Sequence, residues 1–176
     1  MNAPAMVSAK RQREIRSILR QTKLLAARYY KLTGKPLGVT GEIAEYAAAE
    51  RLKLTLAAAR TAAFDATARN AGRLEYFQIK GRAVDPSDRY RGRVPKIGLG
   101  GAFDTVLLVL LDKTTFDAIE IWKATRRKVE KRLTDPGSRA RNERGQMSIS
   151  QFKSIAEKVW PASAKVKRKG RATRST

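Results

Sequence analysis

The sequence contains neither cysteine nor histidine. The first absence excludes disulfide bonds, cysteine nucleophiles and zinc sites with thiolate ligands. The second excludes imidazole metal ligands and every acid–base scheme that uses histidine. If the chain is an enzyme, carboxylates, amides and lysines must therefore carry its chemistry. A hard cation such as magnesium, which binds oxygen ligands, would assist them.

Long apolar runs are also missing. No apolar segment approaches the length of a membrane-spanning helix, and the opening residues MNAPAMVSAKRQREIRS lack the apolar stretch of a secretory signal. We therefore expect a soluble, cytoplasmic protein with no membrane association. The hydrophobic share of 42% is typical of a globular protein, and 176 residues suffice for one domain with a hydrophobic core.

Acidic residues are scarce beside basic ones. The chain has 38 lysines and arginines against 16 aspartates and glutamates, which gives a net charge of +22. Self-repulsion of this size is usually tolerated when the partner is a polyanion. We therefore expect DNA as the partner and keep RNA as an alternative. Whether the chain forms a homodimer is left open.

Hydrophobic periodicity indicates four helices. Apolar residues at three- and four-residue steps predict a long amphipathic helix from about Val7 to Leu32. The second helix, VTGEIAEYAAAERLKL, is expected to begin with Thr40 as its N-cap. The other two are TRRKVEKRL and SISQFKSIAEKVW, the latter with a capping box formed by Ser148 and Gln151.

Four strands are expected between these helices. AFDAT and RLEYFQIKGRA are joined by the turn RNAG and predict a hairpin. FDTVLLVLLD is almost uninterruptedly apolar, which is typical of a strand buried on both faces, and FDAIEIWKA follows it. We expect an α/β fold with a mixed central sheet flanked by helices. Its parts are an N-terminal helical extension (1–35), one domain (36–161) and a disordered basic tail (162–176).

The strand FQIKGR places an amide and an ammonium on one face. Side chains alternate along a strand, so Gln78 and Lys80 share a face while Phe77 and Ile79 share the opposite one. The preceding strand carries Asp65, and Glu42 lies in the first turn of the second helix. A carboxylate is a suitable ligand for a hard cation, and a lysine can orient water or stabilise charge on a phosphate.

This order of elements, with FDA followed by a turn and QIKGR, resembles the PD-(D/E)XK nuclease superfamily, in the variant with glutamine before the lysine as in Mrr-type endonucleases. The resemblance implies a restriction endonuclease-like fold and a magnesium-dependent endonuclease. By the same resemblance, Asp65, Gln78, Lys80 and Glu42 would form the catalytic site. The magnesium ligands would be Asp65, Gln78, Glu42 and the carbonyl of Ile79. The chain departs from the motif in two ways: it has no proline before Asp65, and Gln78 removes one negative charge from the metal site.

The expected nucleic-acid contacts are basic residues around a long polar loop, together with one aromatic residue for base stacking. They are Arg82, Arg89, Tyr90, Arg91, Arg93, Lys96, Arg126 and Arg127. Two other functions remain open: a catalytically silent DNA- or RNA-binding module of the same fold, and a structural basic protein of a nucleoprotein particle.

Overall fold

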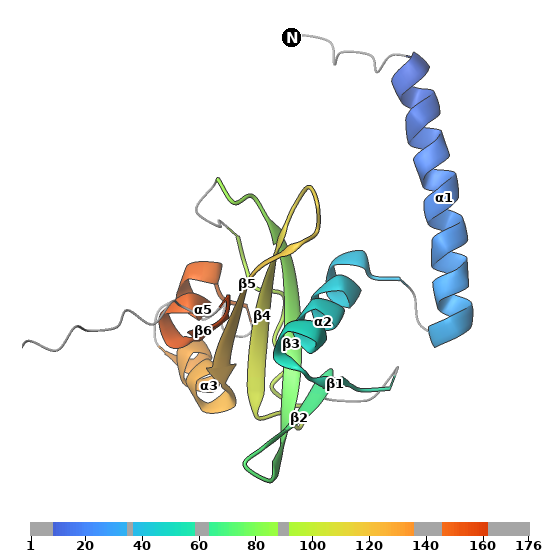
Figure 1. The fold of residues 1–176 in the computed structure, drawn as a ribbon. Helices are drawn as coiled ribbons and strands as arrows, with labels where there is room; N and C mark the ends of the chain where they lie inside the picture. The colour runs from blue at the N-terminus through green and yellow to red at the C-terminus, as the bar shows by residue number, and fades with distance from the viewer. Residues whose placement is uncertain (1–8, 35–36, 59–63, 88–91, 136–145, 162–176) are drawn as a thin grey trace, which may run out of the picture.

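The computed structural model describes residues 9–34, 37–58, 64–87, 92–135 and 146–161 (Figure 1). Its centre is a six-stranded sheet in which the strands follow one another in sequence order. Only β3 and β4 are parallel, and every other neighbouring pair is antiparallel. The strands are β1 (Thr55–Leu56), β2 (Ala66–Asn70), β3 (Arg73–Val84), β4 (Thr105–Asp112), β5 (Ala118–Thr125) and β6 (Glu157–Trp160).

Helices cover both faces of this sheet. Helix α2 (Val39–Leu52) lies on one face, and α3 (Arg126–Thr134) and α5 (Ile149–Ile155) lie on the other (Figure 1). Helix α1 (Ala9–Thr33) extends away from the sheet. No helix in the described parts of the chain is both long and apolar enough to span a bilayer. The arrangement agrees with the α/β class and the mixed sheet expected from the sequence.

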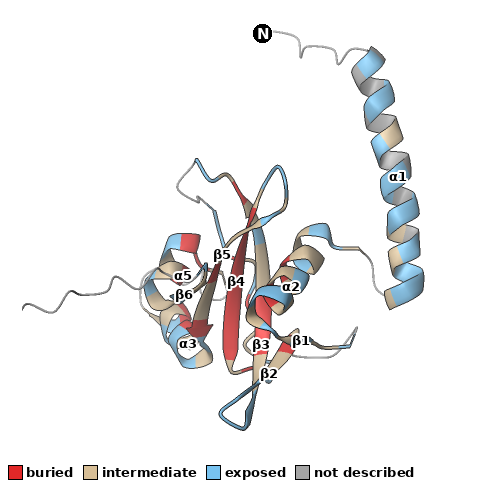
Figure 2. Cartoon of the chain, in the orientation of Figure 1, coloured by how far each residue is buried: buried red, intermediate tan, exposed pale blue. Residues whose placement is uncertain are grey.

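The core consists of two apolar layers on opposite faces of the sheet. Figure 2 shows the buried residues concentrated along β4 and the neighbouring part of β3. Val106, Leu108 and Leu110 of β4 pack with Phe152 of α5 on one side. Leu107, Val109 and Leu111 point the other way, toward the α2 side. Because β4 is buried on both faces along almost its whole length, its predicted role as a central strand is confirmed.

The hairpin expected between the first two long strands is confirmed. Strands β2 and β3 pair antiparallel from Asn70 opposite Arg73 to Ala66 opposite Phe77. Ala71 and Gly72 form the turn, and both have positive φ angles, 48° and 82°. Such angles match the twist of a two-residue hairpin turn, and glycine adopts them without a steric penalty.

The structure corrects two local predictions. The last helix was expected to reach Trp160, but it ends at Ile155, and Glu157–Trp160 forms β6 beside β5. Strand pairing with β5 satisfies the backbone there, while Val159 and Trp160 pack into the apolar layer on the α2 side. Thr40 is not an N-cap, because α2 already begins at Val39, preceded by Gly38. The capping box of Ser148 and Gln151 is confirmed.

A close contact sets the position of α2 on the sheet. A Cβ atom at Gly81 of β3 would lie 2.5 Å from the Cβ atom of Ala44 and 2.6 Å from the carbonyl oxygen of Thr40. Only glycine leaves room for the helix at this distance. Gly81 therefore brings the first turn of α2 onto β3, next to Lys80.

Candidate functional site

The candidate site lies where β2 and β3 part. Their pairing ends with Ala66 opposite Phe77, so the outer edge of β3 beyond Phe77 has no strand beside it in the described residues. Asp65 precedes β2 directly, and its Oδ2 atom accepts a hydrogen bond of 2.6 Å from the N–H of Ile79. The carboxylate of Asp65 thus accepts the hydrogen bond that a backbone carbonyl would accept if β2 continued alongside β3. This contact fixes the carboxylate at the edge of β3.

A cavity of about 510 Å³ opens at this edge. Helix α2 contributes Gly41 and Glu45 to its lining, and Asp65 and Lys80 come from the two sides of the hairpin. The remaining lining residues are Thr40, Ile79, Gly81, Arg82, Ala83 and Pro95. Two residues that were predicted to act together, Asp65 and Lys80, therefore border the same space.

Lys80 is the most unusual ionisable group of this cavity. Burial lowers its pKa from the ordinary value of 10.5, because an ammonium group loses hydration there. The carboxylates of Asp65 and Glu45 act in the opposite direction, since they favour the charged form. A lysine that is partly dehydrated and faces two carboxylates is typical of functional sites.

Of the two glutamates near the start of α2, Glu45 and not Glu42 lines the cavity at Lys80. Glu42 accepts a hydrogen bond from the hydroxyl of Tyr29 in α1 and lines neighbouring cavities, but not the one at Lys80. Glu45 lines the Lys80 cavity together with Gly41, four residues earlier on the same helical face. The sequence could not distinguish the two glutamates, because the choice depends on which face of α2 rests on Gly81.

Gln78 lies deeper than Lys80. Its residue is only 9% exposed, and it does not line the cavity. A Cβ atom added to Gly98, in the segment before β4, would lie 3.8 Å from its Nε2 atom. Its Oε1 atom is buried without a hydrogen-bond partner among the described residues. An unpaired buried acceptor costs stability, so this oxygen would gain from a cation or a donor.

The donor set of the site suits a hard cation. Within the described residues, no group of three or more carboxylates is close enough to hold a metal ion. Magnesium does not need such a group, because it is commonly bound by one or two carboxylates with water and substrate phosphates completing its shell. Asp65 and Glu45, both at the cavity, would supply two such carboxylates.

Comparisons with known proteins do not assign a family. No family model matches the chain, and no curated protein matches its sequence. The function must therefore be inferred from the chemistry of the residues themselves.

The basic residues named as nucleic-acid contacts fall into three groups. Arg82 is exposed and lines the Lys80 cavity, and Arg93, Lys96 and Arg127 are exposed elsewhere. Arg89, Tyr90 and Arg91 lie outside the described residues, as does the C-terminal tail. Arg126, described next, differs from both groups.

Arg126 uses its guanidinium within the chain. It donates hydrogen bonds of 2.6 Å to the carbonyl oxygens of Gly101 and Leu99, and another of 2.6 Å to Glu130. The group also lies over the ring of Phe103. With these donors engaged, Arg126 holds the segment before β4 and is poorly placed to bind phosphate.

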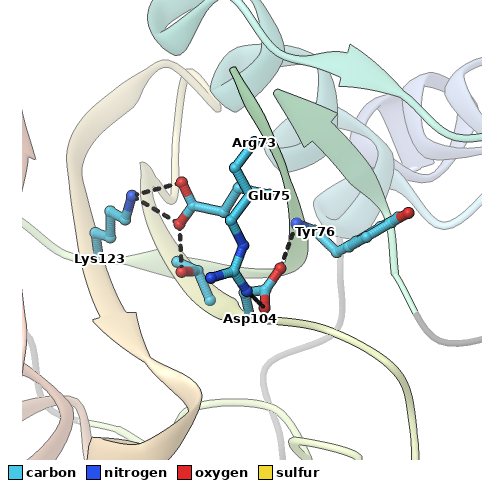
Figure 3. Close-up of polar contacts among 6 residues, drawn as sticks. Arg73, Glu75, Tyr76, Asp104 and Lys123 are labelled. Carbon is cyan, nitrogen blue, oxygen red and sulfur yellow. Dashed lines mark hydrogen bonds and ion pairs between the residues drawn. The ribbon is translucent and has the colours of Figure 1, made fainter. Parts of the chain in front are cut away.

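A second polar cluster, not anticipated from the sequence, lies near the other end of β3 (Figure 3). Glu75 accepts a hydrogen bond of 2.6 Å from the hydroxyl of Thr105 and forms an ion pair of 2.9 Å with Lys123. Asp104 accepts a hydrogen bond from the backbone N–H of Tyr76. Thr105 is buried, and the charges of Glu75 and Lys123 compensate each other. The cluster therefore ties β3, β4 and β5 together.

Proposed function

We propose that the chain is a magnesium-dependent endonuclease that hydrolyses phosphodiester bonds of DNA, on a restriction endonuclease-like fold. One observation carries the proposal: Lys80, with its lowered pKa, shares a cavity with Asp65 and Glu45. A stable core gains nothing from a half-buried lysine, whereas phosphoryl transfer needs a cationic group beside anionic metal ligands.

The positive charge of the chain would bind the DNA substrate through its phosphates. A net charge of +22 attracts the DNA backbone, and every neutralised phosphate releases counterions. Arg82 follows Lys80 by two residues on β3, and its exposed side chain lines the same cavity. A guanidinium there can hold a phosphate with two parallel hydrogen bonds. This contact would place the scissile phosphate next to Lys80.

The residues of the cavity then divide the chemistry between them. The ammonium of Lys80 donates hydrogen bonds to the phosphate oxygens, and partial dehydration strengthens its attraction to the negative charge that develops there. The hydrogen bond from Ile79 keeps the carboxylate of Asp65 in one orientation. Asp65 and Glu45 would hold magnesium, which neutralises phosphate charge and lowers the pKa of bound water.

A binding module without catalysis is the second candidate. Gln78 carries no charge and does not line the cavity, and among the described residues no third carboxylate lies beside Asp65 and Glu45 to help them hold a cation. Binding alone needs only the basic surface. In that case DNA or RNA would bind, but no divalent cation would support cleavage.

Cleavage assays decide between the two functions. We expect the wild-type chain to cut supercoiled plasmid or linear duplex DNA with magnesium and to be inactive with a chelator. Single-stranded DNA and RNA, tested in parallel, identify the preferred nucleic acid. DNA binding without cleavage under any divalent cation would contradict the nuclease proposal and support the binding module.

Matched substitutions test which carboxylates matter. Asp65→Asn and Glu45→Gln keep the shape of the side chain but remove the charge, so each should lower kcat by at least about a hundredfold with DNA affinity nearly unchanged. Glu42 lies about one turn before Glu45 on the same helix, and the control variant Glu42→Gln should retain activity. Circular dichroism checks that all three variants fold. Equal activity in Glu45→Gln and Glu42→Gln would remove Glu45 from the site.

A further inference from the structure

A second cavity, of about 630 Å³, lies between α2 and the turn that joins β4 to β5; we call it the α2 groove. Apolar side chains make up most of its lining, among them Leu37, Ile43 and Phe116. Tyr46 also lines the α2 groove and is 61% exposed. Apolar surface that is left in contact with water gains stability when an occupant covers it.

The charged residues of the α2 groove are mostly acidic. Glu50 of α2 and Asp117 of the β4–β5 turn both line it, and both are exposed. Neither of these two carboxylates forms an ion pair within the described residues. Glu42 adds a third carboxylate, whereas Arg51 is the one basic residue among the lining residues. The α2 groove is therefore acidic on balance, in a chain whose net charge is +22.

An apolar surface bordered by carboxylates suits lysine and arginine side chains. Their methylene groups can lie along Ile43 and Phe116 while their charged ends reach Glu50 and Asp117. The exposed ring of Tyr46 can attract a cation through its face. DNA does not fit this surface, because the carboxylates would repel its phosphates. The chemistry of the α2 groove therefore favours a basic segment of polypeptide.

The chain supplies such a segment beside the α2 groove. Trp160, the last residue of β6, packs in the apolar layer on the α2 side. The guanidinium of Arg51, which lines the α2 groove, lies 5.1 Å from the centre of the Trp160 ring. Residues 162–176 follow almost directly and contain six lysines and arginines but no acidic residue. When extended, a segment of this length spans up to about 50 Å, so it can reach the whole groove.

We propose that residues 162–176 bind in the α2 groove of their own chain, with basic side chains paired to Glu50 and Asp117. The covalent link raises the effective concentration of this segment at the α2 groove, which favours it over the same segment of a second copy. Exposed ion pairs are individually weak and are screened by salt. The contact is therefore reversible, and DNA phosphates can compete for the same basic side chains. The inference is independent of the proposed nuclease activity.

Zero-length cross-linking tests this contact in the intact wild-type chain. A carbodiimide joins a lysine amine to a carboxylate only where the two groups touch, and peptide mapping by mass spectrometry identifies the pair. At low salt we expect cross-links from the lysines of residues 162–176 to Glu50 and Asp117. Their yield should fall at least about threefold in 1 M salt, where screening acts within about 3 Å. A mixture of isotopically labelled and unlabelled chains shows whether the cross-links form within one chain.

Matched charge variants give a second measurement. Because the chain has no cysteine, a dye attached to Gly170→Cys reports only on the C-terminal segment, through its fluorescence anisotropy. Glu50→Gln combined with Asp117→Asn should lower this anisotropy to the value that the unsubstituted groove gives in 1 M salt. Glu14→Gln combined with Glu157→Gln removes the same charge from two exposed residues outside the α2 groove, and it should leave the anisotropy unchanged.

Three results would overturn the proposal. One is a wild-type chain in which no lysine of residues 162–176 cross-links to Glu50 or Asp117. The second is a set of cross-links that form only between labelled and unlabelled copies, which would mean that the α2 groove binds the segment of another chain. The third is an equal anisotropy in the two double variants, which would show that the segment responds to net charge and not to the α2 groove.

Discussion

Lys80 occupies a position that folding alone does not favour. Its ammonium group is partly buried, and burial lowers its pKa despite the two carboxylates nearby. The neighbouring carboxylates reduce the cost but do not cancel it, since the net shift remains downward. A residue that costs stability and persists at a cavity is a candidate for function.

Lys80→Met should therefore separate stability from activity. Methionine keeps most of the length of the side chain and removes the charge, so the free energy of unfolding should rise while cleavage falls at least about a hundredfold. The variant should exceed the wild type in stability by the largest amount at pH values below the lowered pKa of Lys80, where the wild-type lysine is charged in the folded state. This difference should shrink as the pH rises from there toward 10.5, because the folded state then loses its proton before the unfolded state does. Urea unfolding between neutral and alkaline pH measures this difference.

Lys96→Met is the control for that comparison, since Lys96 is exposed. It should change neither the free energy of unfolding nor its pH dependence. A Lys80→Met variant that is less stable than the wild type, or fully active, would contradict our interpretation of this site.

Part of the site could be predicted at the residue level. The resemblance to the nuclease superfamily predicted that Asp65 and Lys80 would meet, and both line one cavity, although Asp65 directly precedes β2 instead of lying in the strand as expected. The depth of Gln78 could not be predicted, because it depends on the segment around Gly98, which is far along the chain. Likewise, an arginine in a basic segment is expected to bind phosphate, but the guanidinium of Arg126 donates hydrogen bonds to carbonyl groups of its own chain.

At the level of elements, the contact between α2 and β3 determines which residues reach the site. Thr40 and Ala44 rest on Gly81, and this contact turns Gly41 and Glu45 toward Lys80. The sequence predicts both α2 and β3, yet it contains no signal for the rotation of the helix about its axis. A glycine in a strand indicates only that something approaches closely.

Gly81→Ala tests the importance of this contact. The added Cβ would meet a helix backbone that cannot move aside cheaply, so we expect a loss of about 1 to 3 kcal/mol in stability. Activity should fall as well, because Glu45 would be displaced together with the helix. Thermal melting followed by circular dichroism measures the loss, and the cleavage assay measures the activity.

Gly100→Ala is the matched control, since a Cβ at Gly100 meets nothing within 4 Å. It should change stability by no more than about 0.5 kcal/mol. If Gly81→Ala melted like Gly100→Ala, the helix would not be held by this contact.

Strand β6 shows where local patterns fail. Ile149, Phe152 and Ile155 repeat with helical spacing, and nothing in the next residues marks a break. The helix nevertheless ends at Ile155, because the residues after it pair with β5, a strand formed about 35 residues earlier. Pairing between distant segments overrides local propensity, and a single sequence does not reveal it.

At the level of the whole molecule, charge is the dominant property. A net charge of +22 should make DNA affinity fall steeply with salt. In a plot of the logarithm of the binding constant against the logarithm of the salt concentration, each neutralised phosphate should contribute about 0.9 to the downward slope. The adjacent residues Arg127 and Arg126 should differ in this respect. Arg127→Ala should reduce the slope by about 0.9. Arg126→Ala should leave the slope unchanged and lower thermal stability, since it removes hydrogen bonds within the chain.

Fluorescence anisotropy with labelled duplex DNA across a salt series measures these slopes. Removal of residues 162–176, which contain six lysines and arginines, should lower the slope further. An affinity that does not depend on salt would indicate that the basic surface has another purpose.

The overall class was predictable because it depends on strong, local patterns. A hairpin turn, a continuous apolar strand and alternating strands are sufficient to predict a mixed sheet with helices on its faces. The direction of β4 relative to β3 was not predicted. It follows from the path of the long segment between them, and that path is fixed by distant contacts such as those of Arg126.

The apolar character of β4 has a consequence for the newly synthesised chain. TVLLVLL is a seven-residue segment without charge or proline, of the kind that self-associates into cross-β fibrils when it is exposed. Until β5 has formed, one edge of β4 is uncovered, and both of its faces still lack their helices. Asp104, Asp112 and Lys113 flank the segment with charges that disfavour such stacking. The strand at the centre of the core is thus also a segment that can aggregate before folding is complete.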